Sequence, residues 1–159
     1  MECYEGATMI KTYRGVLDGT NPEAGQQDRI RLKTLKGDIG YRIAKLQAFP
    51  SSPGTSNYEA LISVWKLKQS WLSTDTPTAD FTDGDLLGGV WIEGASSNVN
   101  ADTMHVIFDK EIFNQDIYIT CVNTETGLMN YYLELEQVKL SDNESTMATL
   151  QSLRQIAEN

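Results

Sequence analysis

The chain has 159 residues, with 13 basic and 22 acidic side chains and a formal net charge of −9. This length predicts one domain whose core is large enough to fold without disulfides or metal ions. The acidic balance argues against direct nucleic-acid binding, which needs a basic surface. Apolar runs of at most three residues predict no membrane-spanning helix.

Alternating apolar and polar residues predict strands along the first half of the chain. We expect them at residues 8–17, 29–34, 41–49 and 58–67. The third changes phase, because Ile43 and Leu46 fall on opposite faces of a regular strand. A β-bulge near Ala44 and Lys45 would bring them to one face.

Four more strands are expected in the second half, at residues 86–93, 104–108, 117–122 and 131–140, after a long polar loop at 70–85. Eight strands separated by turns predict an antiparallel β-sandwich, and specifically a single jelly roll. The period-two pattern places six residues in one core between two sheets: Leu32, Ile43, Val106, Ile119, Leu133 and Leu135.

The end of the chain changes from the strand period to the helix period. Ser141 and Glu144 have the spacing of a capping box, which predicts a helix from about residue 143 to 157. Apolar residues then recur at every third position: Met147, Leu150, Leu153 and Ile156. We therefore expect a flexible N-terminus (1–7), a sandwich (8–140) and a helix of the same domain (141–159).

Candidate catalytic groups are few. His105 is the single histidine, and it could serve Cys121 as a base, although no nucleophile motif surrounds the cysteine. Glu134 and Glu136 share one strand face, as a glycosidase pair could, but outward acids are usual on a solvated strand. We expect no enzymatic activity and no cofactor.

Two kinds of ligand remain open. Asp80, Asp83 and Asp85 lie close together in a loop and could hold calcium, although their spacing is not that of an EF-hand. Trp65, Trp71 and Trp91 could stack on sugars, or could serve as packing anchors.

Cys3 and Cys121 could form a disulfide, but two free thiols and the lack of a signal peptide favour synthesis in a reducing cytosol.

Self-association is suggested by the fourth predicted strand. It carries apolar residues on both faces, and we expect a single sandwich to cover only one of them. The predicted interface residues are Tyr58, Trp65, Met147, Leu150, Leu153 and Ile156.

Charge is unevenly placed along the chain. Residues 1–80 carry a charge of +1 (10 basic, 9 acidic), and residues 81–159 carry a charge of −10 (3 basic, 13 acidic). This difference could steer copies of the chain head to tail, or the acidic surface could simply aid solubility.

Several segments resemble small uncharacterised proteins encoded in marine bacteriophage genomes. They are residues 30–35, 40–43, 108–120, 130–136 and 143–150. The resemblance implies a structural virion protein of jelly-roll type, and it carries no catalytic residues. The expected protein is therefore a capsid or capsid-associated component (shell, vertex or decoration), made in the host cytoplasm and located in the virion.

Such a protein would contact copies of itself, as a trimer or pentamer, and other virion proteins, without direct contact to nucleic acid. The alternative is a carbohydrate-binding module used for host attachment, and an acidic glycosidase is a more distant third. Glycan binding that disappears when an exposed tryptophan is replaced would favour the module, whereas closed rings or shells would favour the virion component.

Overall fold

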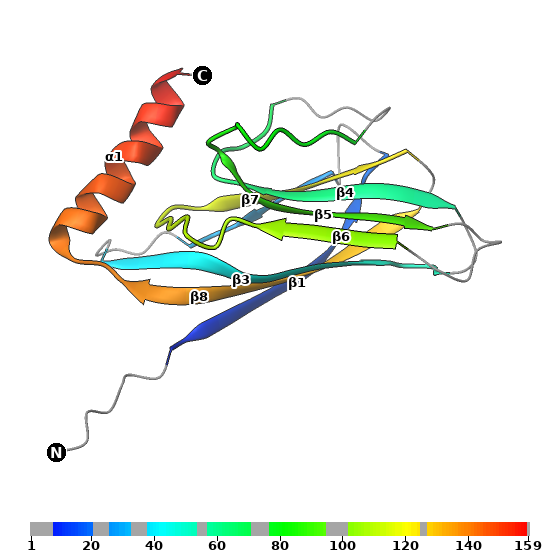
Figure 1. The fold of residues 1–159 in the computed structure, drawn as a ribbon, viewed down its shortest axis with the longest axis horizontal. Coiled ribbons are helices and arrows are strands. Elements are labelled where there is room, and N and C mark those ends of the chain that lie inside the picture. Colours follow the sequence, from blue (N-terminus) through cyan, green and yellow to red (C-terminus); the bar gives the residue numbers. More distant parts are fainter. Residues whose placement is uncertain are drawn as a thin grey trace, which may run out of the picture.

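The computed structural model describes residues 8–20, 26–32, 38–53, 57–70, 77–94, 102–124 and 127–158. They form eight strands and one helix (Figure 1). The strands are β1 (Ile10–Asp18), β2 (Gln27–Ile30), β3 (Ile39–Pro50), β4 (Tyr58–Trp65), β5 (Leu86–Gly94), β6 (Asp102–Ile107), β7 (Ile117–Asn123) and β8 (Leu128–Lys139), and the helix is α1 (Asp142–Glu158). The predicted segments 1–7, with Cys3, and Trp71 lie outside the described residues.

The strands form two antiparallel sheets packed face to face. One sheet has the order β1-β8-β3, and the other has the order β2-β7-β4-β5-β6. Strands from the two ends of the chain pair in a nested way: β1 with β8, β2 with β7, and β4 with β5. This nesting is the arrangement of a jelly roll, so the predicted fold class is confirmed.

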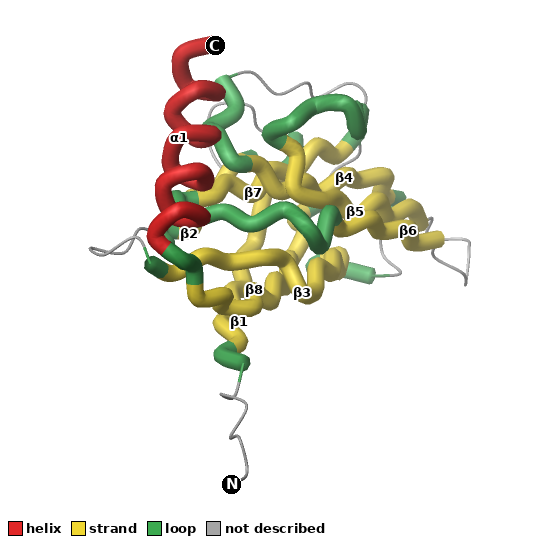
Figure 2. Tube along the Cα trace, turned by 60° about the vertical axis from the view of Figure 1, so that its left-hand side comes forward, coloured by secondary structure: helices red, strands yellow, loops and turns green. Residues whose placement is uncertain are grey.

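One strand departs from a regular jelly roll. In full nesting β6 would pair with β3, but here it pairs with β5 at the end of the five-stranded sheet. In Figure 2 β6 lies at the outer end of the upper layer. Thr103 to Val106 are exposed along this strand, so β6 has solvent on both faces.

Local features follow the sequence closely. The register between β3 and β8 shifts between Ile43 and Lys45, so Ala44 forms the predicted bulge and both Ile43 and Leu46 are buried. Gly127 lies directly before β8 and has a φ of 134°, a conformation that favours glycine. The bulge keeps the apolar side chains of β3 in the core along its whole length.

The core lies between the two sheets and confirms five of the six predicted residues. Leu32, Ile43, Ile119, Leu133 and Leu135 are buried. The prediction for Val106 was wrong, since 39% of its surface is exposed. Val106 pairs with Gly89, whose neighbour Val90 faces the core, so Val106 lies on the outer face of the sheet.

The helix α1 stands beside one end of the sandwich, next to the end of β8 (Figure 1). No helix in the described part of the chain has the length and apolar character needed to cross a membrane.

Candidate interaction surfaces

The N-terminus of α1 is fixed by the predicted capping box. The backbone N–H and the hydroxyl of Ser141 both donate to Oε2 of Glu144, at 2.9 and 2.8 Å. The N–H of Glu144 donates back to the Ser141 hydroxyl at 3.4 Å. These hydrogen bonds lower the pKa of Glu144 below its ordinary value. The charged carboxylate also lies at the end of the helix where the macrodipole favours a negative charge.

The helix turns a polar face toward its own sandwich. Ser145, Ala148 and Thr149 are half-buried on that face, and the Asn114 side-chain amide donates to the Thr149 hydroxyl at 3.1 Å. Small and polar residues on the inner face leave little apolar area to bury there. The helix is therefore held to its sandwich without its larger apolar side chains.

Those apolar side chains point into solvent. The exposed fractions are 62% for Met147, 57% for Leu150, 56% for Leu153 and 58% for Ile156. The three-residue spacing makes them a row inclined to the helix axis, a ridge of the kind that packs into a groove on a partner. We name Met147, Leu150, Leu153 and Ile156 the α1 ridge.

Two predicted interface residues belong to the protein's own packing. Tyr58 is only 8% exposed and lies in the core between the sheets, so its assignment to an interface was wrong. Trp65 is half-buried, and its indole N–H donates to the Thr120 hydroxyl at 2.8 Å. The sequence could not distinguish these residues from interface anchors, because aromatic residues serve both purposes.

The second apolar face of β4 is covered by the chain itself. Leu61, on the outer side, is 8% exposed, and its pairing partner Val122 is 9% exposed. Figure 1 shows described parts of the connection between β4 and β5, within residues 66–70 and 77–85, on this side of the five-stranded sheet. The expectation that a single sandwich leaves this face open was therefore wrong, because a long connection covers it.

The unequal charges of the two halves meet within one molecule. Three ion pairs join a basic residue before position 80 to an acidic residue after it: Arg29–Asp116, Arg42–Glu136 and Lys66–Glu111. The nested strand order places strands of the two halves side by side, so these described charges pair within one molecule. The structure therefore gives no support to head-to-tail steering by opposite faces.

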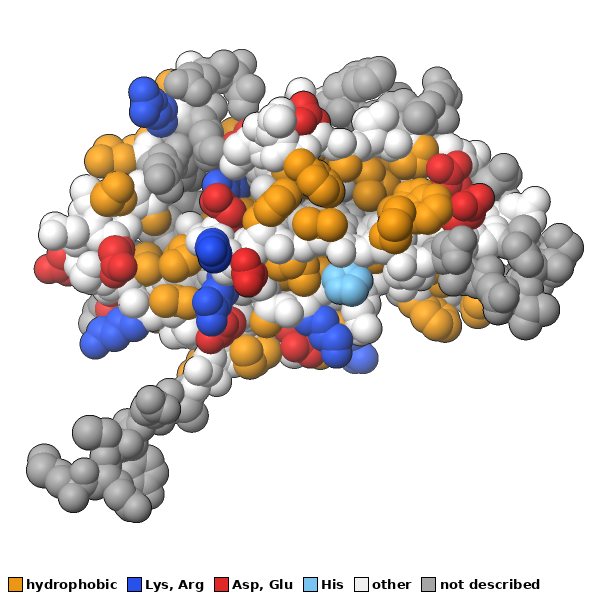
Figure 3. Space-filling model, viewed as in Figure 1, with side chains coloured by type: hydrophobic (Ala, Val, Ile, Leu, Met, Phe, Trp, Pro, Cys, Tyr) orange, Lys and Arg blue, Asp and Glu red, His pale blue; other side chains and the backbone are white. Residues whose placement is uncertain are grey.

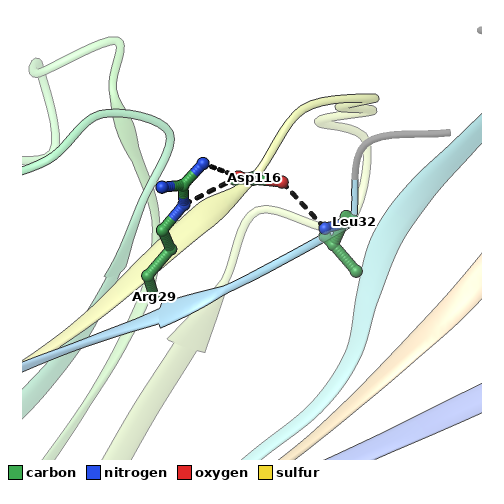
Figure 4. A network of polar contacts seen from close by, with 3 residues as sticks. All are labelled: Arg29, Leu32 and Asp116. Atoms are coloured by element: carbon green, nitrogen blue, oxygen red, sulfur yellow. Dashed lines mark hydrogen bonds and ion pairs between the residues drawn. The ribbon is translucent and has the colours of Figure 1, made fainter. Parts of the chain in front are cut away.

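Asp116 shows how one acid joins distant segments. It accepts from the Arg29 guanidinium through one carboxylate oxygen and from the Leu32 backbone N–H through the other, at 2.9 Å (Figure 4). The hydrogen bonds with Asp116 raise the pKa of the Arg29 guanidinium above its ordinary value. This network fixes the segment after β2 against the start of β7, and Leu32 is buried there.

A hollow of about 660 Å³ lies between the end of α1 and the connection after β4. Its lining includes Arg29, Asp116, Lys66 and Ile156. The first two pair with each other, and Lys66 pairs with Glu111 at 2.9 Å. Two basic residues of the lining are therefore already paired with acids, and one residue of the α1 ridge also belongs to the lining.

The calcium candidates are turned back onto their own loop. Oδ1 of Asp80 accepts from the N–H and hydroxyl of Thr82, at 2.9 and 2.6 Å. Oδ1 of Asp83 accepts from the N–H of Asp85 at 2.9 Å. Among the described residues no cluster of three or more acids, histidines or cysteines forms, so Asp80, Asp83 and Asp85 are not brought together.

The catalytic candidates are also separated. Cys121 is buried in β7, whereas His105 is exposed on β6, three strand positions away in the same sheet. Three strand spacings amount to about 14 Å, too far for a nucleophile and its base. Burial raises the pKa of the Cys121 thiol to about 12 and disfavours the reactive thiolate.

The two glutamates of the glycosidase alternative have other partners. Glu134 accepts a hydrogen bond from the Tyr132 hydroxyl at 2.8 Å. Glu136 forms an ion pair with Arg42, and that arginine lowers the pKa of its carboxyl. Both acids lie in a hydrogen-bonded row on the outer face of the three-stranded sheet.

The sequence reasoning missed one surface, the open edge of β6. Met104 is 64% exposed on this strand, next to the exposed Val106. Figure 3 shows hydrophobic side chains gathered on this side of the molecule, near the pale-blue histidine. A signal was present, because this predicted strand has no lysine, arginine or proline, residues that commonly protect an edge.

No protein-family model matches the chain, and no curated protein sequence matches it. Among solved structures, one similar chain is VP1 of Merkel cell polyomavirus, determined as an unassembled pentamer. The two chains are 10% identical, the match covers 86% of this chain and 97% of VP1, and the TM-score is 0.42. The strand pairing, rather than this likeness, defines the present chain as a jelly-roll β-sandwich.

Proposed function

We propose that the chain is a self-associating structural component of a bacteriophage virion, in a shell, vertex or decoration role. The observation that carries the proposal is the α1 ridge, four apolar side chains that are each more than half exposed on a jelly-roll domain. Burying such a ridge against another subunit removes apolar surface from water, at about 25 cal/mol per Å². The role is structural rather than enzymatic and needs no cofactor.

Two further observations support this role. The segments that resemble phage-encoded proteins include parts of β7, β8 and α1, and so reach the helix that carries the ridge. The net charge of −9 favours a position away from the packaged genome. The partners are copies of the chain, in closed rings of three or five, and other virion proteins.

The test is the size of the protein in solution, by multi-angle light scattering and negative-stain electron microscopy. The double variant Leu150→Lys/Leu153→Lys places charges in the ridge and should reduce the association measured for the natural sequence. Leu128→Lys is the matched control, since Leu128 is 46% exposed at the opposite end of β8. It should leave assembly unchanged.

Deleting residues 143–159 should weaken assembly more than it lowers the melting temperature, because the ridge lies outside the core. A natural-sequence protein that stays monomeric at about 50 µM, in low and moderate salt, and is missing from virions would contradict the proposal. Binding to a glycan array that is lost in Trp91→Ala would favour the carbohydrate-binding alternative.

A further inference from the structure

The described parts of the two sheets end in four edge strands, and three of these strands are protected against pairing with another chain. Charged side chains stand on these three edges: Lys11 and Arg14 on β1, Asp28 and Arg29 on β2, and Arg42 and Lys45 on β3. β3 also has its bulge, and β2 is only four residues long. Charges, bulges and short length are the usual means by which proteins keep open edges from pairing.

The fourth edge, β6, has an acid only at its first residue, Asp102, and lacks these protections along the rest of its length. From Thr103 to Ile107 it has no charged side chain other than the ionisable His105, and its register with β5 is continuous. Within the described residues, β6 pairs on one side only. An edge of this kind is a template for another strand.

The backbone groups of β6 alternate between β5 and the open edge. The N–H of Phe108 donates to the carbonyl of Leu87 at 3.1 Å, so residue 108 directs its backbone toward β5. In an antiparallel ladder this direction recurs every second residue. Thr103, His105 and Ile107 therefore present their N–H and C=O groups to the open edge.

The side chains alternate in the same way. Met104 and Val106 stand on the outer face, opposite Trp91 and Gly89 of β5. They are 64% and 39% exposed. Apolar side chains in this position gain contacts if a second strand adds to the edge, because directly opposed residues of neighbouring strands lie side by side.

We propose that β6 pairs antiparallel with β6 of a second copy of this chain, with His105 opposite the same residue of the other copy. A two-fold axis at this point joins two five-stranded sheets into one continuous sheet. Thr103 then lies opposite the second copy's Ile107, so backbone groups that face the open edge bond to one another. Met104 lies opposite the second copy's Val106, in a closely spaced pair on the outer face.

Charge favours a second copy at this edge over the edges of the three-stranded sheet. The same pairing at β1 or β3 would bring Arg14 or Lys45 close to its own equivalent, and like charges on adjacent strands repel. At β6 the opposed residues from Thr103 to Ile107 carry no acid, lysine or arginine. The contact deepens the proposed self-association by naming a second interface, independent of the α1 ridge.

The first experiment measures association after the ridge has been removed. In the Leu150→Lys/Leu153→Lys background, sedimentation velocity at about 1 to 100 µM should still show a monomer–dimer equilibrium. Adding Met104→Lys/Val106→Lys places like charges opposite each other twice and should raise the dimer Kd at least about tenfold. Adding Met104→Lys/Val106→Glu instead opposes lysine to glutamate in both pairs and should preserve the dimer.

The second experiment tests the register by cross-linking. In a Cys3→Ser background, His105→Cys places the two thiols opposite each other at the two-fold axis, where the Cα atoms of a bonded pair are about 5.5 Å apart. Mild oxidation should give a covalent dimer on a non-reducing gel. The control is Thr103→Cys, whose equivalents are four residues out of register, about 13 Å apart along the strand, and should not cross-link.

The outcomes separate the two proposals. A ridge variant that is wholly monomeric at about 100 µM would overturn the β6 contact while leaving the α1 contact standing. Equal association of the two charge variants, or equal cross-linking of the two cysteine variants, would also overturn it. A β6 dimer in a protein that is missing from virions would sustain this inference and contradict the proposed function.

Discussion

Alternate side chains of β8 form the centre of the sandwich, because this strand lies between β1 and β3. Met129, Tyr131, Leu133 and Leu135 point inward and are each at most 6% exposed. The residues between them face solvent on the other side of the sheet and are only partly covered. Each inward residue of this strand therefore contributes to holding the two sheets together.

Replacing Leu133 with alanine should destabilise the protein by about 2–5 kcal/mol, because it is fully buried and the substitution leaves a cavity. The measurement is the free energy of unfolding from a urea titration. Leu128→Ala, at an exposed position of the same strand, is the control and should cost well under about 1 kcal/mol. Similar losses in both variants would show that the inward register of β8 is wrong.

The Cys121 thiol couples stability to alkaline pH. Burial raises its pKa from 9.0 to about 12, so the folded state keeps a proton that the unfolded state releases. A raised folded-state pKa gives stability that is complete below pH 9 and is lost as the pH rises toward 12. Burial also raises the pKa of Tyr131, so this residue too makes stability fall as the pH rises. The contribution of Tyr131 is present both in the natural sequence and in a Cys121→Ala variant.

Between pH 9 and 11 the free energy of unfolding should therefore fall more steeply for the natural sequence than for Cys121→Ala. The difference in slope should be at most about 1.4 kcal/mol per pH unit. In the folded protein Cys121 should also resist a thiol reagent at pH 8 and react once urea is added. Equal slopes in the two proteins would contradict a buried, protonated thiol.

At the scale of the element, α1 depends on its capping box more than a packed helix would, since its apolar side chains face solvent. Removing the Ser141 hydroxyl leaves the N–H of Glu144 without its capping acceptor. Because the pKa of Glu144 is lowered in the folded protein, the stability that its carboxylate adds to α1 is fully present above the ordinary carboxyl pKa. It is lost as the pH falls through the lower, folded-state value.

Ser141→Ala should cost the helix about 0.5–2 kcal/mol and reduce the helical circular-dichroism signal at neutral pH. The melting temperature of the sandwich should change little, because the core does not include α1. Ser70→Ala, which removes an exposed hydroxyl from the connection after β4, is the control. An unchanged helical signal in Ser141→Ala would show that the cap does not stabilise α1.

At the scale of the whole molecule, nested pairing makes the two halves of the chain depend on each other. Among the described strands, β1 to β4 pair with none of one another, and each pairs with β5, β7 or β8. All three ion pairs also join the two halves. The first half therefore has no sheet of its own.

Fragments 1–78 and 79–159 should each be unfolded when made separately. Mixed in equal amounts, they should regain the near-ultraviolet circular dichroism and the cooperative unfolding of the intact chain, because the cut falls in the connection between β4 and β5. The fragments carry opposite net charges, so the rate of recovery should fall as salt is added. A cooperative unfolding transition in fragment 1–78 alone would contradict the interleaved core.

Local sequence determined the elements of this protein. Period-two alternation located all eight strands, the change of phase in β3 located the bulge at Ala44, and the spacing of Ser141 and Glu144 located the start of α1. These features depend on neighbours a few residues apart, so the sequence contains the whole signal. The same alternation identified Leu133 and Leu135 as core residues, because a strand between two others has its faces fixed.

Only the tertiary structure decided which surfaces remain free. Tyr58 is buried in the core and Leu61, on the outer side of β4, is also buried, whereas Val106 is exposed because its register with β5 places it on the outer face. Three ion pairs among the described residues join basic residues of the first half to acidic residues of the second. Each of these outcomes depends on contacts between residues far apart in the sequence, and a local pattern contains no information about which distant segment will cover it.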